Sequence, residues 1–90
     1  MIIDVVNVKI LDGYNLLLQF NDGNSGKVNV ENIIKFEGIF APLQDYDYFV
    51  KVHVNPDIGT ICWENGADIA PDFLYHNAVK ECDEYSGFIN

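Results

Sequence analysis

The chain has 90 residues, the length of one small domain, and 49% of them are hydrophobic. Its 14 acidic residues stand against five lysines and no arginine, so the formal net charge is -9, which disfavours direct contact with the phosphate backbone of nucleic acid. There is no run of about 18 apolar residues and no signal-peptide pattern, so we expect a cytoplasmic protein without a membrane partner, in which Cys62 and Cys82 are reduced thiols.

Alternating apolar residues predict two strands within the first twenty positions. The period of two runs over 6–11 and returns over 14–20. A two-residue turn would put the two apolar faces on opposite sides of the sheet, so we expect a three-residue loop, 12–14, with Gly13 at positive φ. The pairs in this register are Ile10 with Leu16, Val8 with Leu18 and Val6 with Phe20.

The next segment predicts a third strand and then short helical turns. The turn at 21–24 precedes a strand over 27–30, with Val28 and Val30 facing inward, and the same parity argument favours a loop one residue longer than the minimal turn. The segment 31–43 loses the period of two, so we expect two single turns of helix there. The apolar residues that we expect to cover one edge of the sheet are Ile33, Phe36, Phe40 and Leu43.

A second hairpin is predicted after position 48. The strand 48–54 would place Val50, Val52 and Val54 on the core face and Phe49, Lys51 and His53 on the other face. Pro56 and Gly59 favour a four-residue hairpin loop between Asn55 and Thr60. The resulting pairs are Val54 with Ile61, Val52 with Trp63 and, on the outer face, His53 with Cys62.

The last predicted element is a helix that begins at Pro71 and ends near Cys82. Pro71 suits the first helical position, and Asp72 suits the positive end of the helix dipole. The apolar stripe consists of Leu74, Tyr75, Ala78, Val79 and Cys82. We therefore expect one α+β domain, 1–82, with a small antiparallel sheet of about five short strands in hairpins, a short helical segment in the middle and a C-terminal helix packed on the sheet. Residues 83–90 form a C-terminal tail of uncertain order.

The segment 63–75, Trp-Glu-Asn-Gly-Ala-Asp-Ile-Ala-Pro-Asp-Phe-Leu-Tyr, is the most distinctive part of the chain. Together with Phe20-Asn21-Asp22-Gly23, Leu43-Gln44-Asp45 and Tyr48-Phe49 it resembles the bacterial family called domain of unknown function 2442, over most of residues 3–80. The signature residues are Trp63, Asn65, Gly66, Asp68, Pro71, Leu74 and Tyr75. The resemblance implies an α+β fold and no established activity. It also implies a protein partner, because members are often encoded beside a second small protein, as in toxin–antitoxin pairs.

Two departures from the family pattern matter. Ala70 stands where the family usually has Ser, so the side-chain cap of the last helix is missing at an expected cost of about 1 kcal/mol, unless Asp68 takes over the exposed N–H groups. Some longer relatives carry a helix-turn-helix after this domain, and no DNA-reading element can be carried over to this chain.

No candidate catalytic or metal site is strong. Cys62 and His53 could be drawn as a nucleophile with its base, but no third orienting group is evident and the chain is acidic. His53, His76, Cys62 and Cys82 lack a recognised ligand spacing. Glu64 and Asp68 could pose as an acid/base pair, although a solvated residue and a helix cap explain them. We therefore assign no catalytic residue, metal or cofactor and expect no enzyme.

Aromatic residues point to protein binding instead. Tyr is favoured where one end of a side chain is dry and the other wet, and the candidate docking residues are Tyr46, Tyr48, Phe49 and Tyr75. Our hypothesis is a protein-interaction module, the antitoxin-like or regulatory half of a two-protein system, whose partner is a basic or genetically adjacent small protein. Two alternatives stay open. One is a ligand-binding domain or enzyme with a pocket near Trp63, Asp68 and Tyr75, and the other is a homodimer formed through an outer face with Leu17, Phe49 and Cys62.

Overall fold

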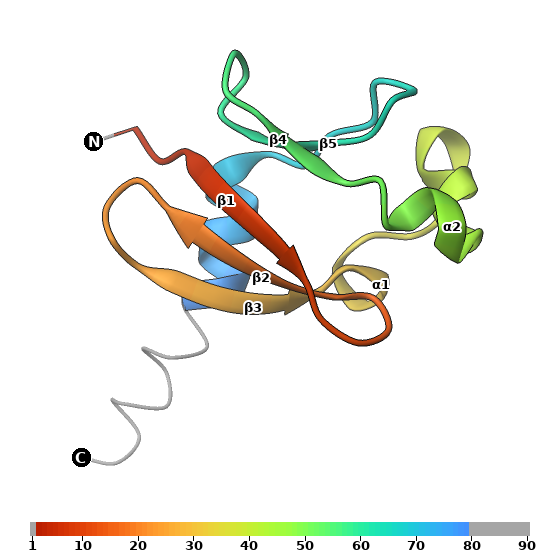
Figure 1. Cartoon of the computed structure of the whole chain (residues 1–90), viewed down its shortest axis with the longest axis horizontal. Helices are drawn as coiled ribbons and strands as arrows, with labels where there is room; N and C mark the ends of the chain where they lie inside the picture. Colours follow the sequence, from red (N-terminus) through yellow and green to blue (C-terminus); the bar gives the residue numbers. More distant parts are fainter. Residues whose placement is uncertain (1, 80–90) are drawn as a thin grey trace.

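The computed structural model describes residues 2–79, which form the predicted α+β fold (Figure 1). Three antiparallel strands form one sheet in the order β1-β2-β3, and two more strands form a separate hairpin. The strands are β1 (Val5–Ile10), β2 (Asn15–Phe20), β3 (Ser25–Asn29), β4 (His53–Asn55) and β5 (Thr60–Cys62). The short helical elements are α1 (Val30–Ile33), the 3-10 helix η1 (Gly38–Gln44) and α2 (Tyr46–Phe49), and a last helix covers 71–79.

The β1–β2 hairpin has the predicted three-residue loop. Gly13 has a φ of 58°, and Ile10 faces Leu16 as expected. The predicted pairing of Val6 with Phe20 is wrong, because Val5 occupies that place. A β-bulge at Val6 adds one residue to β1, so the alternation shifts: Val5 enters the core and Val6 is exposed.

The second turn also has the predicted extra residue. The N–H of Phe20 donates to the carbonyl of Asn24 at 2.9 Å, and Gly23 has a φ of 91°. The strand begins at Ser25, earlier than predicted, and it ends before Val30. The reason is that the Asn29 side chain accepts a hydrogen bond from the N–H of Asn32 and so begins α1.

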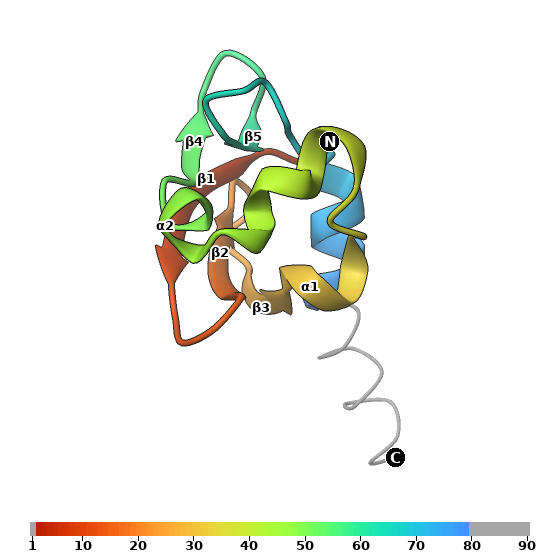
Figure 2. The ribbon, with the colours of Figure 1, turned by 90° about the vertical axis from the view of Figure 1, so that its right-hand side faces the viewer.

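The segment before the second hairpin contains a helical turn where we predicted a strand. The Asp45 carboxylate accepts a hydrogen bond from the N–H of Asp47 and starts α2. This turn reverses the predicted faces, because Phe49 is completely buried while Val50 is exposed. Strand geometry resumes only at His53. Figure 2 views the molecule from the end where η1 and α2 lie together.

The β4–β5 hairpin has the predicted register. Asn55 faces Thr60, Val54 faces Ile61 and His53 faces Cys62. All three residues of β5 are buried, including Cys62, which we expected on an outer face. An isolated bridge between Cys62 and Asp68 explains the difference, since the chain that follows β5 folds back along it.

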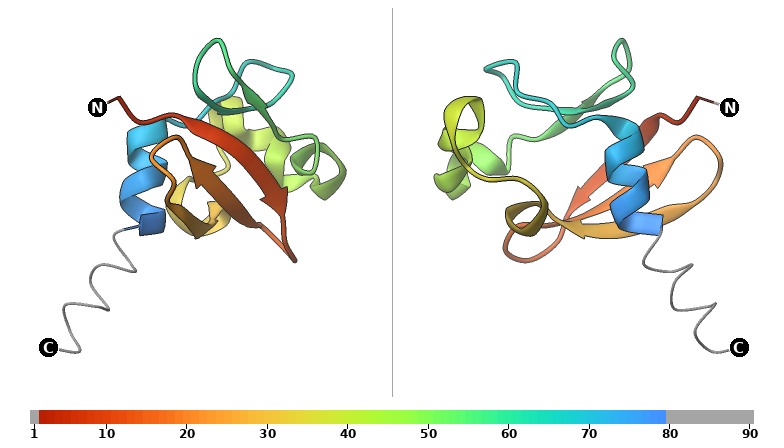
Figure 3. Two further views of the ribbon diagram at one scale, coloured as in Figure 1. Left: turned by 60° about the vertical axis from the view of Figure 1, so that its left-hand side comes forward. Right: turned by 180° about the vertical axis from the view of Figure 1, so that it is seen from behind.

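The last helix begins at Pro71, as predicted, and covers the inner face of the three-stranded sheet (Figure 3). Its buried residues are Leu74, Ala78 and Val79. Ala78 lies against Gly26 of β3, where an added Cβ would be only 2.8 Å from the Ala78 Cβ. Cys82 and the tail 83–90 lie outside the described residues. Within 2–79, no helix has the length and apolarity needed to cross a membrane.

Candidate functional site

The β4–β5 hairpin brings Cys62 and His53 together, as its predicted register implied. The Cys62 Sγ lies 3.4 Å from His53 Nε2, and His53 Nδ1 lies 3.1 Å from the carbonyl oxygen of Lys51. A carbonyl oxygen only accepts hydrogen bonds, so Nδ1 carries the proton and, in the neutral ring, Nε2 accepts from the thiol. The Lys51 carbonyl is thus an orienting group that the sequence did not reveal.

The surroundings of Cys62 oppose nucleophilic chemistry. Burial raises the pKa of the Cys62 thiol above its ordinary value of 9.0, and the Asp68 carboxylate raises this pKa further. A catalytic cysteine needs the opposite change, because the thiolate is the reactive form. The side chain is also only 7% exposed. The thiol therefore stays protonated at neutral pH and donates to His53.

The part of the chain that the structure describes does not contain three or more His, Cys, Asp or Glu side chains grouped to hold a metal ion. Glu64 and His76 are exposed. Within residues 2–79 every buried side-chain nitrogen or oxygen has a hydrogen-bond partner. The interior of this part therefore offers no unsatisfied polar atom as an anchor for a ligand.

The signature segment joins distant parts of the molecule through Asn65. The Asn65 N–H donates to the Tyr48 hydroxyl at 3.0 Å, and its Nδ2 donates to the Ile39 carbonyl at 2.9 Å. Its Oδ1 accepts from the N–H of Ala67, which closes the turn that contains Gly66. Asn65 therefore holds the loop after β5 against both η1 and α2.

Other signature residues also have structural roles. The indole N–H of Trp63 donates to the Phe49 carbonyl at 3.0 Å in the core, and Leu74 is completely buried. Asp68 differs, because its side chain is exposed and makes no hydrogen bond within the described residues. Within these residues Asp68 therefore does not replace the side-chain cap that Ala70 cannot provide for the last helix.

Three of the four candidate docking residues lie on α2, with different exposures. Tyr46 is 41% exposed, and its ring stacks on Phe49 at a centroid distance of 5.8 Å and makes a T-shaped contact with Tyr14 at 5.7 Å. Phe49 belongs to the core, and Tyr48 is half-buried with its hydroxyl engaged by Asn65. Tyr46 is therefore the ring of this group that a partner can reach.

Tyr75 lies apart, on the last helix. Its ring packs edge-on against Phe20 at 5.0 Å, and its hydroxyl donates to Asp22 Oδ2 at 2.6 Å. This hydrogen bond, together with those from Asn24, lowers the pKa of the Asp22 carboxyl. Tyr75 thus connects the last helix to the β2–β3 loop, and the four residues do not form one surface.

The exposed side chains on and beside the contacting elements η1 and α2 include several that the sequence only partly indicated. We call this set the η1–α2 surface, and its residues are Ile39, Tyr46 and Val50 with the exposed acidic side chains Glu37, Asp45 and Asp47. Val50 was missed because it was assigned to the core face of a strand. The signal that could have found it is Asp45, a helix N-cap residue directly before Tyr46.

The alternative sites are arranged differently from our expectations. Of the predicted pocket, Trp63 is buried, Tyr75 packs on Phe20 and Asp68 is exposed to solvent. The predicted dimer face does not exist as one surface, because Leu17 lies on the three-stranded sheet while Phe49 and Cys62 are buried.

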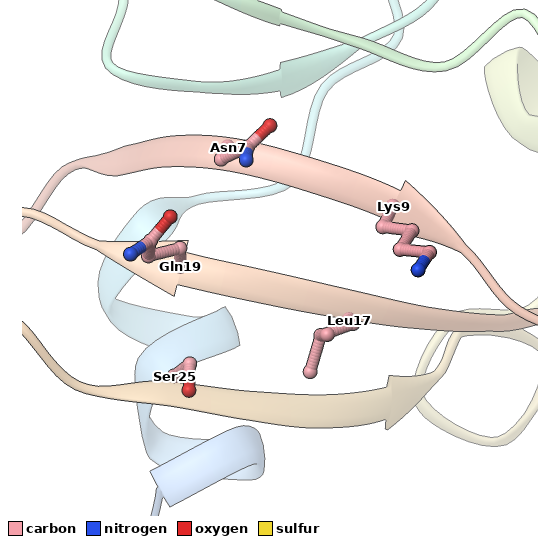
Figure 4. A pocket seen from close by; sticks show the side chains of 5 residues that line it. All are labelled: Asn7, Lys9, Leu17, Gln19 and Ser25. Atoms are coloured by element: carbon pink, nitrogen blue, oxygen red, sulfur yellow. The ribbon is translucent and has the colours of Figure 1, made fainter.

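A pocket of about 250 Å³ lies on the outer face of the three-stranded sheet (Figure 4). Its lining residues are Asn7, Lys9, Leu17, Gln19 and Ser25.

The sequence of the chain was compared with known protein families, curated proteins and solved structures. The family model described as "Protein of unknown function (DUF2442)" matches residues 5–80. No curated protein and no solved structure matches the chain significantly.

Proposed function

This chain belongs to the DUF2442 family, and we propose that it is a protein-interaction module that binds a basic protein partner through the η1–α2 surface. The observation that carries the proposal is Tyr46, an exposed ring held in place between Tyr14 and Phe49. Tyrosine is among the residues that most often dominate the binding energy of an interface.

The support beneath Tyr46 favours tight binding. Tyr14 also meets Phe36 and Phe49 edge-on, at 5.1 and 4.7 Å, and its hydroxyl donates to the Gln44 carbonyl at 3.2 Å. A side chain that is already ordered loses little conformational entropy when a partner binds. Tyr46 can therefore serve as a preorganised anchor, with Ile39 and Val50 as further apolar contact area.

Charge supports a basic partner. Asp45 and Asp47 flank Tyr46, and the whole chain has a formal net charge of -9. Such a field attracts a positively charged protein over a distance. We expect association that is fast at low ionic strength and weaker in salt.

The finer proposal is that the chain is the neutralising or regulatory half of a two-protein system. Its partner would be a small basic protein encoded beside it, and the mechanism would be occlusion of the partner's working surface. The raised pKa of the Cys62 thiol supports a role without catalysis.

The test is co-expression with the product of the adjacent gene, followed by affinity measurement at two salt concentrations. We expect a stoichiometric complex that Tyr46→Ala weakens by roughly 30-fold, the level of an interface hot spot. Phe73→Ala is the matched control, because Phe73 is 42% exposed, as Tyr46 is 41%, but lies on the last helix. Absence of a complex, or equal weakening by both substitutions, would contradict the proposal.

A further inference from the structure

The outer face of the three-stranded sheet is uncovered in the described part of the chain. The last helix packs on the inner face, as its contact with Gly26 shows, and Figure 4 shows five side chains of the outer face on the side of the sheet away from this helix. Six residues of the outer face form two rows that cross all three strands. One row is Lys9, Leu17 and Lys27, and the other is Asn7, Gln19 and Ser25.

This lysine face, defined by those six residues, has a charge opposite to that of the protein. Two of the five lysines of the chain lie on it, and neither row contains an acidic residue. Within residues 2–79 the ammonium groups of Lys9 and Lys27 make no ion pair or hydrogen bond. Leu17, between them, is exposed. The face thus offers two free cations on either side of an apolar side chain.

We propose that the lysine face binds an extended, acidic segment of a partner protein, with carboxylates on both sides of an apolar residue. Neighbouring strands are about 4.8 Å apart, so Leu17 stands midway between lysine backbones about 9.6 Å apart. In an extended segment every second side chain faces the same way, at a spacing of about 6.8 Å. An acid–x–apolar–x–acid pattern therefore places its apolar side chain on Leu17, while the flexible lysine stems lean outward to the carboxylates.

The second row and the shape of the face favour a protein segment over other occupants. Asn7, Gln19 and Ser25 supply hydrogen-bond donors and acceptors for its polar groups. The pocket, at about 250 Å³, is smaller than the roughly 300–1,000 Å³ typical of small-molecule sites. Nucleic acid is disfavoured because the face offers only two lysines, and the chain has no arginine to grip a phosphate backbone. A second copy facing it through the same surface would bring lysines against lysines.

The test is an NMR titration of the 15N-labelled chain with a synthetic peptide whose core is Glu-Thr-Leu-Thr-Glu. We expect amide shifts confined to the lysine face, in fast exchange. Lys9→Glu with Lys27→Glu should weaken binding at least 10-fold. The control pair, Lys35→Glu with Lys51→Glu, changes the net charge equally on exposed positions elsewhere and should leave binding within 2-fold.

Three results would overturn the inference. The two pairs of substitutions could weaken binding equally, which would reduce the effect to net charge. The shifts could map to the η1–α2 surface. The peptide Glu-Thr-Leu-Thr-Glu could bind no more tightly than any one of three competitors, which would remove the role of Leu17. These competitors are the same peptide with Ser in place of Leu, inorganic phosphate, and single-stranded DNA. Spectra of each variant show whether it is folded, and Leu17→Ser tests the apolar contact without changing charge.

Discussion

Gly26→Ala tests the packing of the last helix on the sheet. Gly26 has an ordinary φ, so the backbone itself would accept alanine. The new Cβ would lie 2.8 Å from both the Cβ and the carbonyl oxygen of Ala78, and 2.9 Å from its carbonyl carbon. Carbon atoms in contact are separated by about 3.5–4.0 Å. Since two of the three neighbours are backbone atoms, helix and strand must move apart.

The expected loss of stability follows from two opposing effects. Overpacking costs about 1–3 kcal/mol, while removing a glycine from the unfolded chain returns about 0.4–1 kcal/mol. The net loss is about 1–2 kcal/mol, which lowers the Tm of a domain of this size by roughly 5–15 °C. Urea unfolding should show a lower midpoint with an unchanged m value.

A neighbouring substitution provides the control. Ser25→Ala changes an exposed side chain on the other face of β3, so its effect should stay within about 0.5 kcal/mol. If Gly26→Ala unfolds at the same urea concentration as the unchanged protein, or at a higher one, the close approach of Ala78 to β3 is refuted.

Three further predictions concern the site and its supports. In a Cys82→Ser background, Cys62 should react with iodoacetamide at pH 7.5 at least about 10-fold more slowly in the folded protein than in urea, because its pKa is raised; an equal rate would contradict this. The hydrogen bond from Tyr75 lowers the pKa of Asp22 in the folded protein. This hydrogen bond therefore stabilises the fold at pH values above 3.8, the ordinary pKa, and the stabilisation is lost as the pH falls through the lowered pKa. Tyr75→Phe should therefore lower the Tm at pH 7 and have little effect near pH 2, whereas a constant difference would rule out this linkage. Asn65→Ala removes two side-chain hydrogen bonds and should destabilise the protein by about 1–2 kcal/mol in urea unfolding; an unchanged midpoint would show that the loop holds without them.

Local patterns predicted much of the fold. The parity of apolar positions predicted both three-residue loops, and the register of β4 with β5 followed from Pro56 and Gly59. The bulge at Val6 was not predictable in this way, because Val5 and Val6 are equally apolar and only the packing decides which one enters the core.

Longer-range contacts explain the other differences. The alternation of valines from Val50 favours a strand, but the Asp45 cap and the burial of Phe49 stabilise a helical turn instead. The meeting of Cys62 with His53 could be predicted from the register. The burial of Cys62 could not, because it depends on the bridge to Asp68, which brings a later segment alongside β5.

The lysine face illustrates a further difficulty. The row of Lys9, Leu17 and Lys27 agrees with the predicted alternation of the first three strands, since each of these residues is next in sequence to core residues. Single-strand patterns treat such residues as solvated positions. Their common charge and location become evident only when the three strands are placed side by side.

The hydrogen bonds of Asn65 have a consequence for how members of this family can be compared. A residue that joins the loop after β5 to η1 and α2 supports the architecture whatever the protein binds. Two members that share the signature would therefore share a scaffold and could still recognise unrelated partners. Under the proposed function, differences in partner choice should instead follow the side chains at positions 39, 46 and 50, which are exposed to solvent.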